Sequence, residues 1–556
     1  MLSLRTLNLQ TLCMHIFFKR TLVLLCLLHP LDAIACEAYP QNSMGEQSLF
    51  VGAIQITVED VFNNALATEN LAIHRFANKL HIESKRELIE SQLLFKTGDV
   101  FDIDTLEETA RNLRSNRYLR SATVTPIQIC DRLVDINVVT GDNWSLIPGF
   151  SFARAGGENE YSFQLSELNL LGLGKSLEIE LIRTPERDQR VLLYHDPLLM
   201  GTKTQFTTQL QDNSDGEVQT VVLEQPFFSL DTRMAWRVSA GNTQYLQALY
   251  DDGSLSNQLA IERQFVSVEY GFSEGKQGKV YHDNKVKQHV LRWRMGWAYE
   301  LLGLGATLRF PDSAPEPERV YSYPFLQLSF LRPTFITQTN LQLMESVEDI
   351  AIGHALRARI GLATESFGSH TDAIALEAAY SKGWQPSARI LGLLRSSATG
   401  FVQDDRIEDG LANVNLQGFY FASQKLRSFV AANFVSSARL FEHKQVVLGG
   451  ETGLRGYPLR FQTGARRARF TAEQRYFFDW YPLRLVRVGA AAFADIGSAW
   501  DKGEDPQWLK DVGFGLRIVN TRQAGAKVMH IDFAFPLDET DRVDSFQLVV
   551  TAKAQF

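Results

Sequence analysis

An arginine within a glycine-rich segment is the residue whose chemical role is easiest to infer from this sequence. Arg455 stands in GGETGLRGYPLRF (449–461). Glycine lets a backbone turn tightly, and the guanidinium is a planar fork that stays charged and binds carboxylates through paired hydrogen bonds. We therefore expect Arg455 to lie on a folded-back loop and to require a carboxylate partner. The motif consists of Gly453, Leu454, Arg455, Gly456 and Tyr457.

Two carboxylates stand on the segments that follow this loop. Glu473 lies on the polar face of RARFTAEQRYFF (467–478), and Asp495 lies in RVGAAAFADIGSAWD (487–501), where we expect it to end a strand. Successive residues of a strand point to opposite faces, so each acid belongs to a row with one direction. A charge-assisted pair with Arg455 would hold the loop against both strands.

The alternative interpretation leaves Arg455 on an external, solvated loop. The two acids, Glu473 and Asp495, would then pair with Arg469 and Arg475 of the neighbouring sequence. Ion pairs of that kind contribute little to stability when they lie on a surface. We favour the docked arrangement, in which the loop folds inward.

No other pattern in the sequence predicts an enzyme, a cofactor or a metal site. The segment LNLLGLGKS (168–176) lacks the first glycine of a phosphate-binding loop, because Asn169 stands in its place. The eleven histidines are scattered without the spacing of metal ligands, and no Gly-x-Ser-x-Gly nucleophile elbow is present. An outer-membrane hydrolase with dispersed catalytic residues is the one enzyme hypothesis that remains. The net charge of −8 gives no support to a nucleic-acid partner.

The segments that position these residues alternate apolar and polar side chains from about Ser145 to the end. In KSLEIELIR (175–183) the apolar residues share one face, and in DVGFGLRI (511–518) they oppose small residues and Arg517. Charged inner rows suit a wide, wet lumen better than a soluble core. The chain has no apolar run of about eighteen residues, and only helices and closed barrels span lipid. We therefore predict an all-β, antiparallel transmembrane barrel over 145–556, and the mean hydropathy of −0.13 permits it.

The N-terminus has the features of an export signal. Lys19 and Arg20 precede the apolar run TLVLLCLL (21–28), and Ala33-Ile34-Ala35 places small residues at a cleavage site. The apolar run is too short to cross a bilayer, so we predict a signal peptide over 1–35 and a linker over 36–48. A start at Met14 would give a shorter signal of the same kind.

Removal of that signal leaves Cys36 and Cys130 in the mature chain. An even pair in an oxidising compartment favours a disulfide that ties the new N-terminus to the first domain. Lipidation of Cys36 is an alternative, although Ala33-Ile34-Ala35-Cys36 lacks the usual leucine of a lipobox. Two unpaired thiols are the remaining possibility.

Residues 49–142 read as a small α+β domain. The order is a strand over 49–61, a helix opened by Ser84, a helix opened by Asp104, and two strands over 121–129 and 133–139. Each helix start has an acidic residue three positions after its first polar residue, which is typical of a capping box.

The terminal strand, FQLVVTAKAQF (546–556), has the cleanest alternation and ends on an aromatic residue. Together with the GLRGY loop, it resembles the BamA/TamA-like outer-membrane assembly barrels, the bacterial surface antigen family. The phrase LLFKTGDVFDIDTLEETARNLRSNRYLRSATV (93–124) resembles the POTRA domain of that family. A strand that merely happens to end in phenylalanine is the alternative. The residues that resemble the family's C-terminal barrel signal are Phe546, Leu548, Val550 and Phe556.

The resemblance implies a POTRA domain over 49–142 in the periplasm and a barrel with a re-entrant loop over 446–465. It implies that Arg455 docks against Glu473 and Asp495. The family usually has sixteen strands, whereas a tally of strand-like segments in this chain comes to about twenty.

The function that the resemblance implies is assistance with insertion, assembly or translocation of polypeptides at the bacterial outer membrane. Its partners would be outer-membrane lipid and unfolded polypeptide clients, which the POTRA edge would receive by β-augmentation. The seam between the first and last barrel strands would open laterally. The alternative is a dedicated pore of the two-partner secretion type for one exported protein, and a passive porin is a third hypothesis.

Overall fold

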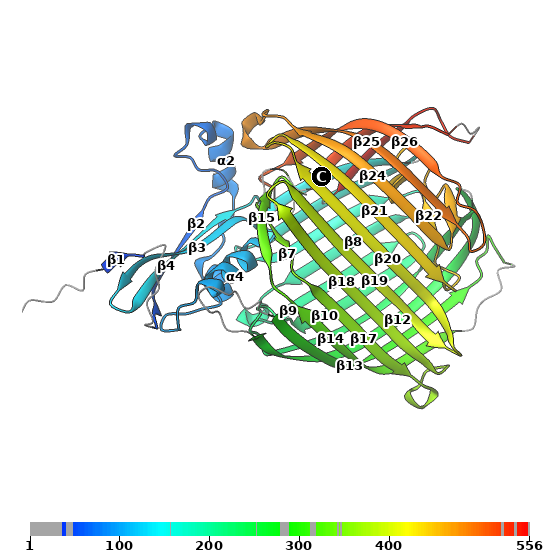
Figure 1. The fold of residues 1–556 in the computed structure, drawn as a ribbon, viewed down its shortest axis with the longest axis horizontal. Coiled ribbons are helices and arrows are strands. Elements are labelled where there is room, and N and C mark those ends of the chain that lie inside the picture. The colour runs from blue at the N-terminus through cyan, green and yellow to red at the C-terminus, as the bar shows by residue number, and fades with distance from the viewer. Residues whose placement is uncertain are drawn as a thin grey trace, which may run out of the picture.

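The computed structural model describes the chain in two parts, a small N-terminal domain and a barrel that it meets at one end (Figure 1). The expected signal peptide over 1–35, most of the linker and Phe556 lie outside the described residues. The described residues are 36–39, 48–155, 157–251, 253–277, 289–311, 318–341, 344, 347–523, 527–538 and 542–553.

The N-terminal domain is a four-stranded sheet covered by two helices. The strand order is β1-β3-β4-β2, in which β2 is parallel to β4 and the other pairs are antiparallel. Leu88, Leu106 and Leu113 of the helices pack against Val134 and Ile136 of the central strand in one buried cluster. Its elements are β1 (Cys36–Ala38), β2 (Phe50–Glu59), η1 (Ala67–Glu69), α2 (Ala72–Leu80), α3 (Arg86–Gln92), α4 (Ile103–Arg114), β3 (Leu119–Cys130) and β4 (Leu133–Asp142).

Both expected helix starts are shifted, and one helix was not expected. Helix α4 begins after Asp102, whose side chain accepts hydrogen bonds from the backbone of Asp104 and Thr105. Ser84 does not cap α3, because its hydroxyl donates to the buried carboxylate of Asp142 at 2.8 Å. The additional helix α2 belongs to a segment that the sequence analysis left without structure.

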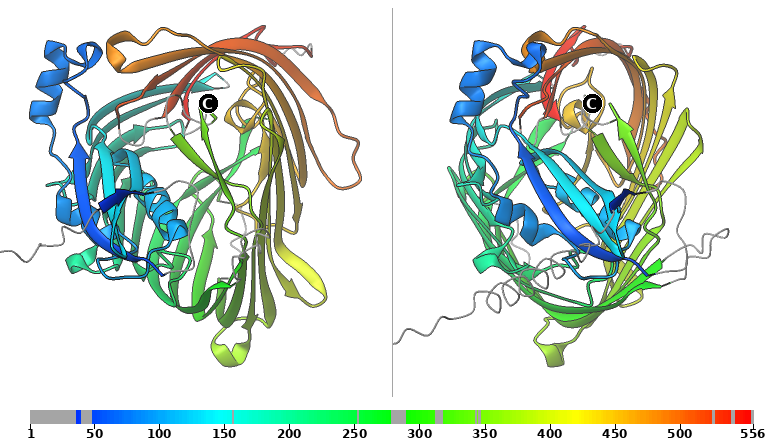
Figure 2. Two further views of the ribbon diagram at one scale, coloured as in Figure 1. Left: turned by 60° about the vertical axis from the view of Figure 1, so that its left-hand side comes forward. Right: turned by 90° about the vertical axis from the view of Figure 1, so that its left-hand side faces the viewer.

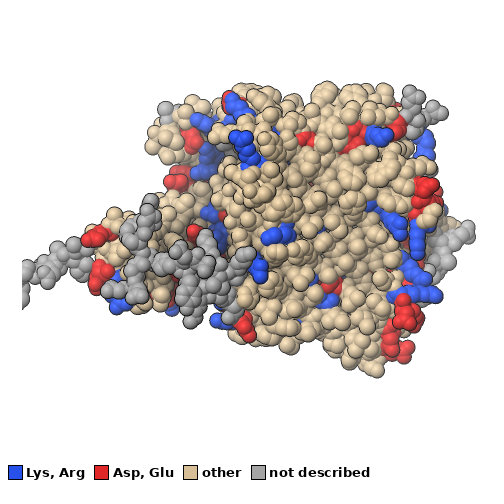
Figure 3. All heavy atoms as spheres, in the orientation of Figure 1, with Lys and Arg blue, Asp and Glu red and all other residues tan. Residues whose placement is uncertain are grey.

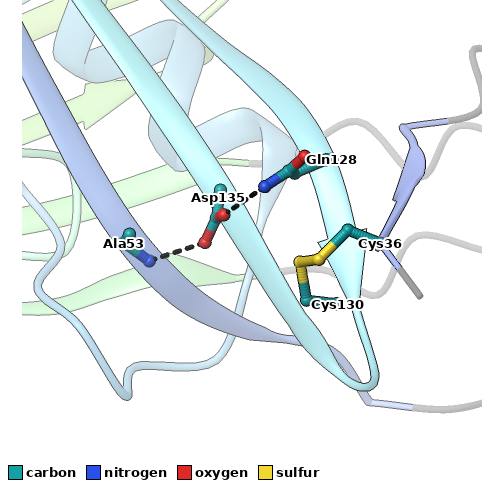
Figure 4. Close-up of a disulfide and its surroundings, with 5 residues drawn as sticks. All are labelled: Cys36, Ala53, Gln128, Cys130 and Asp135. Atoms are coloured by element: carbon teal, nitrogen blue, oxygen red, sulfur yellow. Dashed lines mark hydrogen bonds between the residues drawn. A yellow bond between two sulfur atoms is a disulfide. The ribbon is translucent and has the colours of Figure 1, made fainter. Parts of the chain in front are cut away.

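Cys36 and Cys130 form a disulfide that joins the edge strand β1 to its neighbour β3. Figure 4 shows the bond beside Asp135, which lies on β4 and accepts hydrogen bonds from the backbone of Ala53 and the side chain of Gln128, both at 2.8 Å. The disulfide therefore holds the first described residues at the outer edge of the sheet.

The barrel is a closed antiparallel sheet of twenty described strands. The segment tally therefore gave the right number and the resemblance the wrong one. Each strand of the wall pairs with the strand that follows it in sequence, with three exceptions. At β14–β17 and β21–β24 an inserted hairpin separates the two paired strands in the sequence, and at β28–β5 the last strand closes on the first. The wall strands are β5 (Leu146–Ala155), β6 (Glu158–Leu170), β7 (Lys175–Arg183), β8 (Asp188–Asp196), β9 (Gln205–Asn213), β10 (Gly216–Gln225), β11 (Met234–Asp251), β12 (Ser254–Gln277), β13 (His289–Gly305), β14 (Arg319–Leu331), β17 (Ala355–Ala363), β18 (Ala373–Ser387), β19 (Ile390–Gln403), β20 (Arg406–Phe421), β21 (Leu426–Ala438), β24 (Arg466–Phe477), β25 (Val486–Trp500), β26 (Leu509–Asn520), β27 (Val528–Pro536) and β28 (Gln547–Lys553).

The alternation predicted from the sequence places apolar rows outside and polar rows inside this barrel. Ile179, Leu181, Phe514 and Leu516 are exposed on the outer surface, whereas Arg517 is fully buried on the inner one. Figure 3 shows one face of the wall, on which few side chains are charged, with acidic and basic side chains gathered toward both of its ends. Such a face is the surface that a barrel presents to lipid.

Among the described residues, no helix combines the length and the apolar character needed to pass through a membrane.

The turn between β6 and β7 docks the N-terminal domain onto the barrel. Asn169 donates from its side chain to the Ser84 hydroxyl at 2.9 Å, and Ser84 in turn binds Asp142. Gly172 has a φ of +73°, and a Cβ there would lie 2.4 Å from the backbone oxygen of Glu83. Only glycine permits this conformation at such a close approach.

A second contact between the two parts is made by the hairpin of β15 (Phe335–Thr339) and β16 (Val347–Ala351). Arg114 of α4 donates to both carboxylate oxygens of Asp349, each at 2.7 Å. The hairpin lies within the ring of strands in the right-hand view of Figure 2. Leu341, between its strands, is buried against Leu391 and Phe419 of the inner wall. The hairpin therefore links α4 to the lumen at the end nearest the N-terminal domain.

The disulfide predicts a local effect of its removal. In the variant Cys36→Ser/Cys130→Ser, backbone amides of β1 and of residues 128–130 should exchange hydrogen faster, because a link across 94 residues of sequence is lost. A chain-entropy account assigns such a link about 5 kcal/mol. Hydrogen exchange of the full chain, followed by mass spectrometry, measures this, with the barrel strands as internal control. Unchanged exchange in β1 would contradict the prediction.

Candidate functional site

The loop between β21 and β24 folds back into the barrel. It carries β22 (Val446–Leu448), the single turn η4 (Gly450–Thr452) and β23 (Gln462–Gly464), and it lies inside the ring of strands in both views of Figure 2. Leu448, Leu454 and Tyr457 are fully buried and pack together with Leu509 of the wall. An apolar cluster thus anchors the loop that the sequence predicted to be re-entrant.

Arg455 lies at the centre of this loop and meets three carboxylates. Its Nε and Nη2 donate to the two oxygens of Asp495 at 2.7 and 3.1 Å, which is the bidentate arrangement. Its Nη1 donates to Glu473 at 3.0 Å and to Asp532 at 3.3 Å. The Arg455 side chain is 8% exposed. The structure therefore brings Arg455 together with both acids that the sequence analysis named.

The acids come from neighbouring strands because of the barrel register. Glu473 of β24 is paired with Phe493 of β25, and Asp495 lies two residues beyond Phe493 on the same face. Asp532 projects inward from β27. Asp495 does not end its strand as expected, since β25 continues to Trp500 and pairs with β24 throughout.

Glycines on β26 make room for this cluster. A Cβ on Gly513 would lie 2.3 Å from the ring of Phe493, and a Cβ on Gly515 would lie 2.0 Å from a carboxylate oxygen of Asp532. The Arg455 guanidinium lies 3.4 Å from the centre of the Phe493 ring, so one face of the charge is stacked on an aromatic surface. A side chain at position 513 would displace Phe493, and one at position 515 would displace Asp532.

The surplus negative charge is offset by two further arginines of the wall. Arg475 donates to Glu473 at 2.8 Å, and Arg517 forms an ion pair with Asp532. All of these groups are buried, and a buried charge is tolerated only when it is paired and hydrogen-bonded. The loop arginine therefore completes a network that the wall alone leaves short of positive charge.

Two tethers beside Arg455 extend the contact. The Gly456 backbone N–H donates to Asp511 at 2.9 Å, and a Cβ on Gly456 would lie 2.8 Å from the Cβ of Asp511. The Tyr457 hydroxyl lies 2.7 Å from a carboxylate oxygen of Asp538. All residues of the GLRGY motif therefore touch the wall or the buried core of the loop.

The electrostatic environment of the two loop residues follows from these contacts. Burial acts to lower the pKa of Arg455, but the carboxylates of Asp495 and Glu473 outweigh it and hold the pKa above its usual value. Burial raises the pKa of Tyr457, and the Asp538 carboxylate raises it further. Arg455 thus stays charged and Tyr457 stays protonated under all ordinary conditions.

The same loop also reaches the opposite side of the lumen. Arg460 forms an ion pair with Glu186, in the turn after β7, and lies over the ring of Tyr250 at 4.1 Å. The Gln445 amide donates to the backbone oxygen of Tyr250 at 2.8 Å. The loop therefore spans the barrel from the β24–β27 wall to the β7–β11 wall.

The alternative pairing considered for the two acids is found only in part. Arg475 does bind Glu473, as that alternative required. Arg469 instead donates to the backbone oxygen of Thr452 at 3.1 Å, and a Cβ on Gly453 would collide with it. Arg469 therefore supports the loop backbone, and Arg455 is not exposed to solvent.

The sequence analysis missed Asp511, Asp532 and Phe493 as members of the site. The signal for the first two was available, because each is an acid on the inward row of an alternating segment, the same feature that identified Glu473. Phe493 could not have been identified from the sequence, since its position under Arg455 depends on the register between β24 and β25. No alternation rule distinguishes it from other phenylalanines.

The seam between β28 and β5 is the weakest junction in the described wall. These two strands share one registered pair, Val550 with Arg154, whereas each other junction of the barrel has at least seven. Phe546 is half exposed, and Leu548 and Val550 share its outward row, while Phe556 lies outside the described residues. Few hydrogen bonds hold these edges together.

The chain is similar to solved outer-membrane proteins, at low sequence identity. BamA from Haemophilus ducreyi, in a form lacking POTRA domains 1–3, is 10% identical and covers 93% of this chain and 89% of its own, with a TM-score of 0.37. CdiB from Acinetobacter baumannii is 11% identical over 98% of this chain and 100% of its own, with a TM-score of 0.38. The alcaligin outer-membrane receptor FauA from Bordetella pertussis is 10% identical over 76% and 78%, with a TM-score of 0.33.

A BamA and a CdiB are thus among the structures that this chain resembles, in line with the resemblance seen in its sequence. No protein-family model matches the chain, and no curated protein does. Because the identities and TM-scores are so low, the likeness adds no support to a function.

The Arg455 cluster predicts a large effect of removing its centre. Arg455→Ala should lower the free energy of unfolding of the loop by about 3–5 kcal/mol, because three carboxylates are left buried without their shared partner. Arg455→Lys should be intermediate, since one ammonium cannot serve both oxygens of Asp495 and also Glu473. Protease cleavage within residues 439–465, on the folded barrel, measures the loss.

The matched control for this test is Arg466→Ala, which removes an exposed arginine at the start of β24. Cleavage of the control should equal that of the wild type. Equal resistance of Arg455→Ala and Arg466→Ala would show that the ion pairs do not hold the loop.

Proposed function

We propose that this protein lies in the outer membrane of a bacterium and assists the insertion or assembly of polypeptides there. The lipid-facing rows and the polar lumen support the placement in a membrane. The N-terminal domain would then act as a periplasmic POTRA domain. The seam between β28 and β5 is the observation that carries the proposal.

A seam with one registered pair supports lateral opening. Among the described residues, separating β28 from β5 breaks one registered pair, whereas any other junction would require breaking at least seven. The freed edges would present unpaired N–H and C=O groups, to which the strand of an unfolded client can add. The client would grow against one edge and leave into lipid without ever exposing its backbone to the hydrocarbon core.

The N-terminal domain offers a second pairing edge. Strand β1 covers only residues 128–130 of β3, so residues 119–127 have no strand partner on that side among the described residues. Pro126 lies in this stretch and would interrupt a long pairing, which limits the edge to short client segments. The position of this edge next to the barrel suits transient reception of a client.

Coupling between the two parts has a physical route in the β15–β16 hairpin. The bidentate pair of Arg114 with Asp349 connects α4 to a hairpin that packs on the inner wall. A shift of the N-terminal domain on client binding would pull on this pair. The hairpin and the Arg455 loop together fill the lumen from its two ends, and both are held by ion pairs that can be exchanged.

A dedicated secretion pore for one exported protein is the second candidate function. The observation in its favour is that the lumen of a twenty-strand wall is filled by two inserted segments rather than by wall side chains alone. Displacing both segments would open a path along the axis. The seam would then have no role in transport, and this separates the two candidates.

Reconstitution in liposomes with an unfolded barrel client tests the proposal. The wild type should accelerate folding of the client, and Arg455→Ala should lose most of that acceleration, because the loop no longer braces the wall beside the seam. Arg466→Ala serves as the control and should retain it. Semi-native gel electrophoresis measures the folded client, and ion conductance without folding would favour the secretion pore.

A disulfide lock tests the seam directly. Cysteines in place of Arg154 and Val550, which are registered partners, should form a bond that abolishes client folding, and reduction should restore it. The control pair replaces Ser151 and Ser162, which are partners within the β5–β6 hairpin. Oxidation of the control should leave client folding unchanged. The reduced control also shows what loss of the native disulfide alone does to client folding. Full activity of the locked seam would refute lateral opening.

A further inference from the structure

Helix α2 and the residues before it lie outside the barrel, where an apolar surface is left uncovered. Both views of Figure 2 show the helix standing beside the barrel, next to the turn between β24 and β25. Ile73, Phe76 and Leu80 follow the spacing of one helical face and are 47%, 62% and 56% exposed. Leu66 and Leu71 of the preceding segment are exposed as well. Large apolar side chains gathered on a single surface indicate a partner.

A second face of the same helix is fastened to the barrel by polar contacts. His74 is fully buried, and its Nε2 lies 2.7 Å from the backbone oxygen of Leu483 in the β24–β25 turn. Its ring stacks on Phe62 with centroids 4.3 Å apart. Arg522, at the end of β26, donates to the backbone oxygen of Val61 at 2.9 Å. The helix therefore has a defined orientation, in which the docking residues His74, Phe62 and Arg522 lie beside the apolar face and line the adjacent cleft with it.

The apolar face borders a cleft that continues into the lipid-facing wall. The cleft has a volume of about 340 Å³ and lies between α2 and the first residues of β5. Ile73 and Phe76 line it from the helix, and Trp144, Leu146 and Pro148 line it from the barrel. Leu146 belongs to the outward row of β5 that also carries Phe150, which is 71% exposed. The cleft is thus on the outer side of the wall, beside the seam strand.

We propose that α2 lies in the periplasmic leaflet of the membrane and that the cleft behind it holds an acyl chain of a phospholipid. Continuity with the outward row of β5 selects lipid as the occupant. Trp480 and Leu483, in the turn that binds His74, are also exposed and belong to the same rim. An aromatic residue at the rim is typical of a membrane–water interface.

The charges of the helix fit this placement. Arg75 and Lys79 are exposed one turn apart on α2 and flank its apolar face, since Lys79 follows Phe76 by three residues. An interfacial helix combines an apolar face with basic residues that meet anionic headgroups, and it lies in the plane of the interface. Bound in this way, α2 would fix the N-terminal domain against the bilayer and would keep lipid ordered where the seam meets the periplasm.

This inference rests on the membrane placement of the barrel but not on any client activity. The full-length protein, carrying p-benzoylphenylalanine in place of Phe76, is reconstituted in vesicles of phosphatidylethanolamine and phosphatidylglycerol and irradiated. Mass spectrometry should find a phospholipid adduct at position 76. The same group in place of Glu107, which lies on the exposed face of α4, should give none. Absence of the adduct at 76, or equal adducts at both positions, would overturn the proposal.

A second variant separates lipid contact from folding of the domain. Ile73→Glu/Leu80→Glu, with the photoreactive group still at 76, should lose the adduct, because two carboxylates would be carried into the acyl region. Protection of the β2 and β4 amides in hydrogen exchange shows whether the domain remains folded. A persistent adduct in the folded variant would refute a lipid-facing helix, and a cross-link to protein in place of lipid would refute it as well.

Discussion

The buried ion cluster around Arg455 is the interaction on which the organisation of the lumen depends. Four neighbouring strands contribute acids or arginines to it, and the acids Asp495, Glu473 and Asp532 share one guanidinium that arrives from a loop. Charges enclosed in this way destabilise a protein unless each finds its partner. The loop and the wall are therefore stable only together. The glycines of β26 are part of the same arrangement, since side chains at those positions would displace the aromatic ring and the carboxylate that receive the arginine.

The junctions between the strands of the wall differ in how many residue pairs hold them together. Most junctions are long antiparallel ladders, but in the part of the chain that the structure describes the closure between the last and first strands has a single registered pair. The Arg455 cluster lies on β24 to β27, immediately before the final strand, so the firm part of the wall borders the weak part. A rigid wall next to a loose closure would confine opening to one place, as the proposed insertion of a strand into lipid requires.

The N-terminal domain is held at this end of the barrel by contacts of three kinds. Ser84 and Asp142 bind the β6–β7 turn, Arg114 binds the inserted hairpin, and His74 of α2 binds the β24–β25 turn. The first is buried, whereas the second is a bidentate ion pair between α4 and the β15–β16 hairpin. The third leaves an apolar face beside the seam. In the proposed function, these three contacts would serve position, movement and membrane contact in turn.

Alternation of apolar and polar residues was enough to predict a barrel, its first and last strands, and the inward direction of Glu473, because the side-chain period of a strand is a local property. The glycine-rich loop likewise predicted where Arg455 would be. The addition of Asp532, the stacking on Phe493 and the space above Gly513 depend on register between strands that are distant in sequence. The weakness of the seam and the exposed face of α2 depend on what lies beside them after closure. These features arise from pairing across the whole chain, and only the tertiary structure determines them.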